Sequence, residues 1–285
     1  MNHIKVSELF YSIQGEGRYQ GVPSVFLRTY GCNFTCGGFG MPKGELSSER
    51  DKIQAENYKE YRTLPLVTTG CDSYASWDPR FKHLSPVIDT ANLVSSIIDL
   101  LPTKSWKDEH LVITGGEPLL GWQRAYPELL SYPEMQSLRE LTFETNGTQP
   151  LNDKFVHFLL DWTLNPNWGR RGYDKLTFSV SPKLSISGEK HEDAICPDII
   201  KQYQYVGHTY LKFVVASKED VEEAEEAVNE YRNKGFSGHV YLMPCGGVES
   251  LYHLNNKKVA EFAMAKGWRY SDRLQVPLFK NEWGT

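Results

Sequence analysis

Strand-like and helix-like segments alternate along most of this 285-residue chain. The strand-like segments are short runs rich in β-branched and aromatic residues that stop at glycine or polar residues. They cover residues 24–31, 110–116, 138–147, 175–183, 209–217 and 238–247. Strands joined by helices pair in parallel through right-handed crossovers, and about six such units fit the chain. We therefore expect one α/β domain over residues 1–285.

The clearest helix is expected over residues 217–235. Ser217 and Asp220 have the spacing of a capping box at its start, and Gly235 stands where helices commonly end. The apolar residues at helical spacing form one stripe: Val221, Ala224, Val228 and Tyr231. Two further helices are expected, over 85–101 and 255–267.

Most of the predicted strands end in glycine or polar residues that suit a ligand site. These ends are Gly31, Gly115, Asn146, Ser181 and Met243-Pro244. In parallel α/β architectures, ligands bind at the carboxyl ends of the strands. We therefore expect these ends to converge on one site.

Charge and hydropathy exclude several classes of protein. The formal net charge of −5 argues against direct binding of nucleic acid, which needs a basic surface. No apolar run approaches the roughly 18 residues of a membrane-spanning helix. The opening MNHIKVSELF lacks the apolar core of a signal peptide. We expect a cytoplasmic protein.

The five cysteines indicate bound metal or thiol chemistry rather than disulfides. An odd number without a secretion signal argues against a disulfide framework. Cys32 and Cys36 are a close pair, separated by three residues. An iron–sulfur loop of the C-x3-C-x2-C kind would place its last cysteine at position 39, which is Phe39. A third ligand would therefore come from elsewhere in the chain.

Three other cysteines could supply the third thiolate: Cys71, Cys196 and Cys245. Cys71 is preferred, because Gly70 precedes it and the oxygen-bearing Asp72 and Ser73 follow it. The intervening residues 37–70 show no clean period, and we expect them to be an insert. Closing a loop longer by some thirty residues costs about 2 kcal/mol or less, because loop entropy grows logarithmically with length. Cys196 and Cys245 are expected to be small buried residues.

The number of ligands separates two kinds of metal site. Three thiolates on a four-iron cluster leave one iron open to a substrate or cofactor. Structural zinc takes four ligands, and His83 could serve as the fourth beside the three cysteines. From these residues alone, both sites remain open.

Five motifs near the predicted strand ends resemble those of the radical S-adenosylmethionine (SAM) enzymes. In chain order they are GCNFTC (31–36), CDSYASW (71–77), ITGGEP (113–118), ETNG (144–147) and SPK (181–183). The opening FYSIQGEGRYQGVPSVFLRTYGCN (10–33) and the close RLQVPLFKNEWG (273–284) resemble one family in that class, the 7-carboxy-7-deazaguanine synthases. The resemblance spans nearly the whole chain except 37–69. It implies a partial (β/α)6 barrel of the radical SAM type, with the insert 37–70 in the cluster loop.

The resemblance implies a [4Fe–4S] cluster on Cys32, Cys36 and Cys71, with SAM bound to the open iron through its amine and carboxylate. The residues that it implies for binding SAM are Gly115, Gly116, Glu117, Glu144, Asn146, Ser181 and Lys183. Since glycine has no Cβ, the two glycines would let the backbone approach the SAM amino group closely.

The family's substrate is 6-carboxy-5,6,7,8-tetrahydropterin. The residues that the resemblance implies for its binding are Ser12, Ile13, Gln14, Glu16, Arg28 and Thr114. Arg28 suits the substrate carboxylate, because a guanidinium offers bidentate donors. The family binds Mg²⁺ through a Thr two residues after the third cysteine, and here that position is Ser73, which retains a hydroxyl.

The implied reaction starts with one-electron cleavage of SAM to methionine and a 5′-deoxyadenosyl radical. The radical abstracts hydrogen from the pterin, the ring contracts, ammonia leaves and 7-carboxy-7-deazaguanine forms. The resemblance also implies an electron-donating flavodoxin or ferredoxin and a homodimer. The product would serve queuosine-type tRNA modification or DNA modification. The insert and the chain length depart from the compact members of the family.

Two other hypotheses are a glycyl-radical-activating enzyme and a zinc-stapled α/β module without catalysis. The QGEG opening and Arg28 disfavour the first, because a protein substrate needs no carboxylate clamp on the first strand. The second predicts one zinc ion with four protein ligands.

Overall fold

The computed structural model describes residues 2–164 and 175–285. The strands are β1 (His3–Ile13), β2 (Pro23–Thr29), β3 (Val87–Asp89), β4 (His110–Gly115), β5 (Leu141–Thr145), β6 (Leu176–Val180), β7 (His208–Val215), β8 (Val240–Pro244) and β9 (Arg269–Tyr270). The α-helices are α1 (Thr90–Leu100), α2 (Tyr126–Ser131), α3 (Asp153–Leu164), α4 (His191–Ala194), α5 (Pro197–Val206), α6 (Lys218–Asn233), α7 (Glu249–Lys266) and α8 (Gln275–Phe279). The six predicted strands correspond to β2 and β4–β8.

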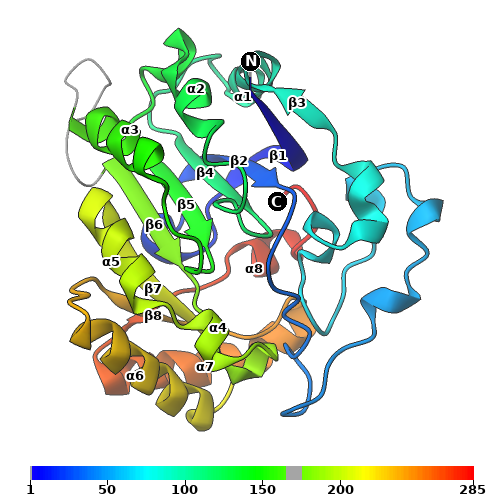
Figure 1. The fold of residues 1–285 in the computed structure, drawn as a ribbon. Coiled ribbons are helices and arrows are strands. Elements are labelled where there is room, and N and C mark those ends of the chain that lie inside the picture. Colours follow the sequence, from blue (N-terminus) through cyan, green and yellow to red (C-terminus); the bar gives the residue numbers. More distant parts are fainter. Residues whose placement is uncertain (1, 165–174) are drawn as a thin grey trace.

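The strands of the described residues form one sheet in the order β3-β1-β2-β4-β5-β6-β7-β8-β9. From β2 through β9, neighbouring strands in this order pair in parallel. The sheet bends into an open, partial barrel, so the predicted fold class is confirmed (Figure 1). β1 was not predicted. It pairs antiparallel with β2, because the short connection between them leaves no room for a crossover helix.

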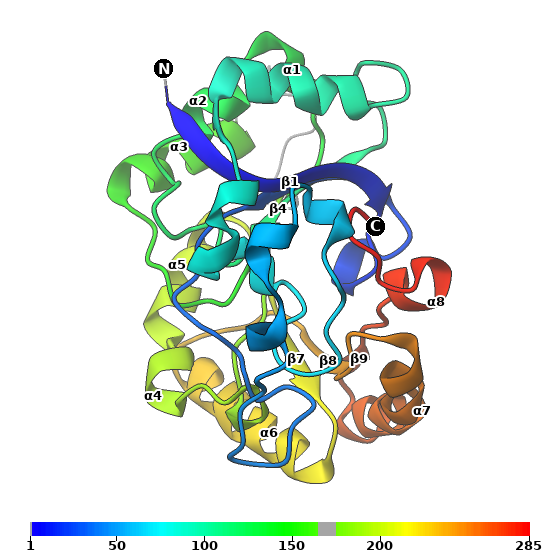
Figure 2. The ribbon, with the colours of Figure 1, turned by 90° about the vertical axis from the view of Figure 1, so that its right-hand side faces the viewer.

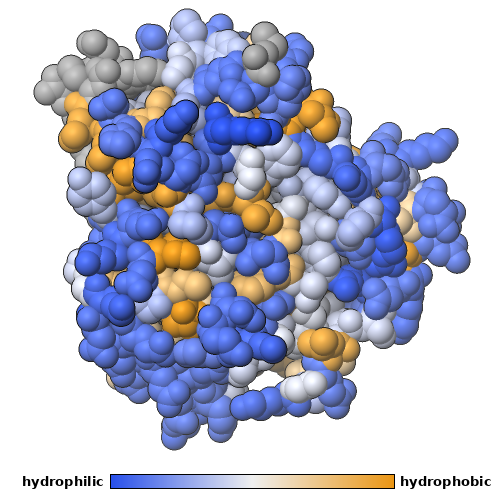
Figure 3. Space-filling view, viewed as in Figure 1, coloured by the Kyte–Doolittle hydropathy of each residue, from blue (hydrophilic) through white to orange (hydrophobic). Residues whose placement is uncertain are grey.

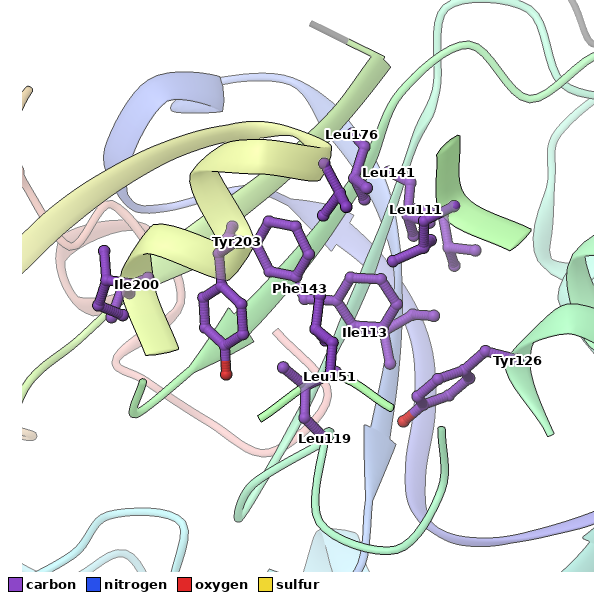
Figure 4. Packing of buried hydrophobic residues seen from close by; sticks show 14 of the residues in the cluster. Leu111, Ile113, Leu119, Tyr126, Leu141, Phe143, Leu151, Leu176, Ile200 and Tyr203 are labelled. Atoms are coloured by element: carbon purple, nitrogen blue, oxygen red, sulfur yellow. The ribbon is translucent and has the colours of Figure 1, made fainter. Parts of the chain in front are cut away.

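The main hydrophobic core lies between the sheet and the helices on its outer face (Figure 1). Aromatic rings continue from one element to the next through this core. Phe143 of β5 lies between Tyr126 of α2 and Tyr203 of α5 (Figure 4). Its ring centroid is 5.2 Å from that of Tyr126 and 5.7 Å from that of Phe178 on β6. This packing buries large apolar side chains, the dominant favourable term in folding.

Helix α6 confirms the predicted capping box and stripe. The amide of Asp220 donates to Ser217 Oγ at 3.1 Å, and the Ser217 amide donates to Asp220 Oδ2 at 2.9 Å. The predicted stripe is buried: Val221, Ala224, Val228 and Tyr231. No helix in the described part of the chain is both long and apolar enough to cross a membrane.

The starts predicted for the other two helices were wrong. Residues 87–89 form strand β3, and α1 begins only at Thr90. The Asp89 carboxylate accepts the amide of Asn92 at 2.9 Å, so Asp89 caps the helix there. α7 begins at Glu249 rather than at residue 255, with Val248 as an N-cap that makes no side-chain hydrogen bond. Without a polar cap, the sequence carried no start signal there.

The insert 37–70 contains three short 3₁₀ helices, η2 (Arg50–Lys52), η3 (Ala55–Asn57) and η4 (Tyr61–Thr63). It runs along the face of the molecule turned away from α3 and α5 (Figures 1 and 2). Buried side chains of the insert and of the residues after it form a small hydrophobic cluster. Its members are Ala55, Tyr61, Leu64, Val67, Tyr74, Ala75 and Phe81. The insert therefore has its own packed centre, separate from the main core.

One backbone hydrogen bond joins the two ends of the insert, and a second ties its start to Ser47 further along it. The amide of Gly70 donates to the carbonyl of Phe39 at 2.7 Å. The amide of Ser47 donates to the carbonyl of Gly37 at 2.8 Å. These bonds bring the residue before Cys71 back to the start of the insert, beside Cys36.

The carboxylate of Glu49 reinforces this closure. It accepts the amides and the hydroxyls of both Thr68 and Thr69, at 2.8–3.0 Å. Burial opposes ionisation of Glu49, but these hydrogen bonds outweigh burial and lower its pKa. We call the Phe39–Gly70 and Gly37–Ser47 bonds, together with Glu49, the insert clamp.

Replacing Glu49 with Ala is expected to loosen the insert. A hydrogen bond to a charged group contributes about 1.5–3 kcal/mol, and partial exposure of Glu49 lowers this toward about 1–2 kcal/mol of unfolding free energy. Urea unfolding measures this loss, and limited proteolysis should cleave within 37–70 faster in Glu49→Ala. Glu45→Ala, at an exposed position, is the control. Equal cleavage rates in the two variants would contradict the role given to Glu49.

Candidate active site

A cavity of about 560 Å³ lies at the carboxyl ends of the parallel strands. This volume is in the range of sites for small molecules and cofactors. Four of the five predicted strand ends line it: Gly115, Asn146, Ser181 and Met243-Pro244. In the view of Figure 3, hydrophilic residues cover much of the rim of the molecule, with patches of hydrophobic residues between them.

Cys32, Cys36 and Cys71 all line this cavity and pack in one cluster with Phe34 and Phe39. Burial raises the pKa of all three thiols, that of Cys32 to about 12. Cys71 also raises the pKa of Cys32, and Cys71 and Cys32 both raise that of Cys36, so neighbouring thiolates are harder to form together. Such thiols lose their protons when a metal centre supplies positive charge, so the donor set fits a metal cluster.

The described residues contain no group of three or more His, Cys, Asp or Glu side chains placed to hold one metal ion. A four-iron cluster binds each thiolate on a different iron, so its ligands stand farther apart than those of one ion. The ring nitrogens of His83 lie 3.2 Å from the carbonyl oxygen of Arg80 and 3.1 Å from that of Tyr58. The zinc hypothesis therefore has no support here.

The other two cysteines differ in position. Cys245 is buried and lines the cavity, while Cys196 is partly exposed and lies outside the cavity lining. The Cys196 thiol donates only a long hydrogen bond, 3.8 Å, to the carbonyl of Asp193. The prediction that both are buried is thus correct for Cys245 alone.

The glycine pair at the end of β4 allows a close backbone approach to the cysteine loop. A Cβ built on Gly116 would lie 2.4 Å from the carbonyl oxygen of Gly31 and 2.7 Å from the Cβ of Cys32. Gly115 has φ +149°, and its Cβ would lie 2.3 Å from the carbonyl oxygen of Thr29. Any side chain here would push β4 away from the end of β2. The pair lines the cavity and also fixes where Cys32 stands.

Glu117, predicted to bind cofactor, lies outside the cavity lining and is fully buried. Its carboxylate accepts the amides of Leu119 and Asn146 and the hydroxyl of Thr145, at 2.7–3.0 Å. Burial, with no paired cation in contact, raises the pKa of Glu117 to about 7. Through these hydrogen bonds, Glu117 holds the ends of β4 and β5 together.

The other predicted cofactor residues line the cavity as polar groups: Glu144, Asn146, Ser181 and Lys183. Glu144 accepts Gln14 Nε2 at 3.1 Å and Thr114 Oγ1 at 3.0 Å. The Lys183 ammonium donates to Ser181 Oγ at 3.1 Å. Glu144 therefore links residues predicted for cofactor and for substrate.

Five of the six predicted substrate residues line the cavity: Ile13, Gln14, Glu16, Arg28 and Thr114. Ser12 does not; it lies opposite Ser24 in the β1–β2 ladder. Arg28 Nε donates to Glu8 at 2.9 Å, and its Nη1 donates to Ser73 Oγ at 3.1 Å. Glu8 and Ser73 thereby hold the guanidinium at the cavity wall.

Glu16 forms a buried ionic network with two residues that the sequence did not predict. Its carboxylate pairs with the ammonium of Lys212 on β7 and with Arg273 Nε at 3.1 Å. Arg273 Nη2 also donates to Asp72 Oδ2 at 2.7 Å. Burial opposes ionisation of Glu16, but the charges of Lys212 and Arg273 outweigh it and lower its pKa to about 2. The sequence did offer one signal of this network, because Lys212 is a charged residue within the apolar run of a predicted strand.

An open α/β barrel with three cysteines and a glycine pair at one cavity is the arrangement that the resemblance to the radical SAM enzymes implies. The crystal structure of QueE from Escherichia coli has the same fold, with a TM-score of 0.55 and 19% identity. That likeness covers 94% of this chain and 93% of the Escherichia coli chain. No protein-family model matches the chain.

The relatives that the chain resembles over nearly its whole length share one name. The chain is 29% identical to the 7-carboxy-7-deazaguanine synthase of Halobacterium salinarum, over 98% of this chain and 91% of that protein. It is 29% identical to the synthase of the same name from Rhodopirellula baltica, over 98% and 88%. A third, from Pyrobaculum aerophilum, is 27% identical over 99% and 97%. The resemblance predicted from the sequence is therefore confirmed.

Glu16→Gln is expected to lower the free energy of unfolding at pH 7 by about 3 kcal/mol, because Lys212 and Arg273 remain buried without their counter-charge. The folded-state pKa of about 2 lies below the ordinary value of 4.5, so the carboxylate stabilises the fold above pH 4.5. The difference between wild type and variant should therefore shrink as the pH falls from 4.5 toward 2.

Urea unfolding of the metal-free protein at several pH values measures this difference. Glu222→Gln removes an exposed helix pair with Lys218 and is the control, with an expected change below about 0.5 kcal/mol. A difference between wild type and Glu16→Gln that stays constant from pH 7 to the acid limit would contradict the role of the network.

Proposed function

We propose that this chain converts 6-carboxy-5,6,7,8-tetrahydropterin to 7-carboxy-7-deazaguanine, with loss of ammonia, as a radical SAM enzyme. The observation that carries the proposal is one cavity shared by Cys32 and Cys36, by the distant Cys71, and by Gln14, Glu16 and Arg28. The relatives over nearly the whole chain bear the name of this activity.

Cys32, Cys36 and Cys71 would hold a [4Fe–4S] cluster. The cluster with SAM would supply reductive cleavage of SAM and so a carbon-centred radical that abstracts hydrogen. The thiols suit this role because they line one cavity, Cys36 buried and Cys32 and Cys71 partly buried, and nearby positive charge favours their proton loss.

SAM would bind beside the glycine pair Gly115-Gly116. Lys183 and Ser181 offer a cation and a hydroxyl for a carboxylate, and Asn146 offers an amide. The Asn146 amide donates to Asn33 Oδ1 at 2.9 Å, which orients it beside the cysteine loop. These groups would position SAM rather than take part in bond changes.

Arg28 would bind the substrate carboxylate. Glu8 accepts from Nε only, so the guanidinium stays oriented while donors remain for a ligand. Burial outweighs the charge of Arg28 and raises the pKa of Glu8, which reduces competition from Glu8 for that charge. Phe10 and Phe26 line the same wall, stacked with ring centroids 4.9 Å apart, and offer a flat apolar surface to a planar ring.

Mg²⁺ would bind through Ser73, whose hydroxyl donates to Asp72 Oδ1 at 3.3 Å, and would replace the hydrogen bond that Arg28 Nη1 donates to the same hydroxyl at 3.1 Å. Hydroxyl and carboxylate oxygens are the ligands that Mg²⁺ prefers. The proposal also includes a cytoplasmic homodimer that takes single electrons from a flavodoxin or ferredoxin. The product would enter queuosine-type or DNA modification.

Cys71→Ala tests the cluster. Loss of one of three thiolates should lower bound iron and sulfide about tenfold or more after anaerobic reconstitution, with loss of the brown colour. Cys196→Ala, outside the cavity lining, should reconstitute like the wild type. Stoichiometric zinc in place of iron in the wild type would contradict the proposed chemistry.

Arg28→Ala tests substrate recognition. Loss of charge-assisted hydrogen bonds of about 1.5–3 kcal/mol should raise the Kd of the carboxypterin about 10- to 100-fold. The Kd of SAM should change less than about twofold, because Arg28 lies among the residues proposed to bind the substrate and not among those proposed to bind SAM. Arg28→Lys should give an intermediate loss of substrate affinity, since lysine keeps the positive charge but lacks the paired N–H donors of the guanidinium.

Equilibrium dialysis of the reconstituted protein gives both constants, and product is detected by chromatography. Arg139→Ala is the control, because Arg139 is exposed outside the cavity lining and pairs with the exposed Asp108. SAM cleavage without a deazaguanine product in the wild type would point to another substrate.

A further inference from the structure

The indole of Trp77 donates a hydrogen bond to the thiol of Cys71. Its Nε1 lies 3.4 Å from Cys71 Sγ, and Trp77 lines the cavity with the three cysteines. Trp77 stands at the end of η5 (Tyr74–Ser76), a short turn between Cys71 and the hydrophobic cluster of the insert. Because Trp77 follows Cys71 closely in the sequence, the backbone keeps the indole donor near the thiol acceptor.

The guanidinium of Arg50, a residue of the insert, lies over the ring of this indole. The guanidinium carbon of Arg50 lies 4.3 Å from the centroid of the Trp77 ring. Arg50 also pairs with Asp51 at 3.3 Å and with Asp78 at 3.8 Å, so its position is fixed by two carboxylates. A cation over an indole is held by the ring quadrupole. Arg50 thereby restricts the ring that donates to Cys71.

Hydrogen bonds to cluster sulfurs are among the factors that set a cluster's reduction potential. Reduction of [4Fe–4S]²⁺ by one electron to [4Fe–4S]⁺ adds negative charge, part of which resides on the sulfurs. An N–H donor stabilises that charge, so it moves the midpoint potential to a more positive value. A nearby cation acts in the same direction.

We propose that Trp77, held by Arg50 of the insert, is a positioning residue that sets the reduction potential of the cluster through its hydrogen bond to Cys71. The inference rests on the proposed function, since it requires a cluster on Cys71. It also gives the insert a direct role at the metal site, because Arg50 belongs to the insert.

Other donors to the thiols come from the backbone and cannot be removed by substitution. The amide of Phe34 lies 3.4 Å from Cys32 Sγ. The amide of Ser73 also hydrogen-bonds the Cys71 sulfur. Trp77 is a side-chain donor, and Trp77→Phe removes the N–H while it keeps an aromatic ring beneath Arg50.

The first experiment compares reconstituted wild type, Trp77→Phe and Trp106→Phe by dithionite titration monitored by electron paramagnetic resonance. Trp106 is the matched control, because its buried indole N–H has no acceptor in the described structure. Trp77→Phe should keep the iron and sulfide content and shift the midpoint potential to a more negative value. Arg50→Gln should shift it in the same direction by less, and Trp106→Phe should not shift it.

An unchanged potential in Trp77→Phe, with full iron content, would overturn the proposal. A second measurement needs no substitution and so covers a variant that fails to assemble. Wild-type protein labelled with ¹⁵N at the indole nitrogen is reduced with dithionite and studied by pulsed paramagnetic resonance. A ¹⁵N coupling to the reduced cluster, with a proton coupling that is lost in D₂O, is expected.

Absence of the indole coupling in a protein that carries a full cluster would overturn the role of Trp77 and leave the proposed function intact. Failure of the wild type to assemble any cluster would instead overturn the proposed function, and this inference with it. Iron and sulfide analysis of the same sample separates the two outcomes.

Discussion

Closure of the insert on itself is the constraint on which the site depends. Cys71 follows Cys36 after 34 intervening residues, yet the three thiols share one cavity. The insert clamp joins Gly37 to Ser47 and Phe39 to Gly70, so the chain leaves and re-enters the cysteine loop at nearly one place. The clamp and the hydrophobic cluster of the insert offset part of the entropy cost of the long loop, so the metal ligands bear less of it.

A buried ionic network connects this loop to the region proposed for substrate. Arg273 bridges Glu16, after β1, and Asp72, next to Cys71. Burial opposes ionisation of Asp72, but Arg273 outweighs it and lowers the pKa of Asp72. Buried charges are tolerated only when they are paired, so each member restricts where the others can stand. The position of Cys71 is therefore coupled to the QGEG segment through side chains as well as through the backbone.

The parallel strands and their polar ends could be predicted, because buried strands read as short apolar runs with clear stops. β1 could not, because a register shift between Val6 and Glu8 interrupts its alternation and places the polar Ser7 and Glu8 at buried positions. The motif residues were brought together largely as predicted, whereas Ser12 and Glu117 lie outside the cavity lining. Lys212 and Arg273 were missed because a buried ionic network depends on tertiary pairing between distant segments. The internal packing of the insert has no periodic pattern to reveal it.

The C-terminal segment completes the side of the cavity that the insert forms. Trp283 Nε1 donates to the carbonyl of Leu64 at 2.9 Å, and its ring meets that of Tyr61 edge-on at 4.8 Å. Trp283 and Gly284 line the same cavity as the cysteines. The insert is thus held at its clamp, at Trp283 and, through Arg50, at Trp77 beside the third thiol. A segment held at three points around one cavity acts as a wall of the site, and its contact with Trp77 links its packing to the hydrogen bond at Cys71.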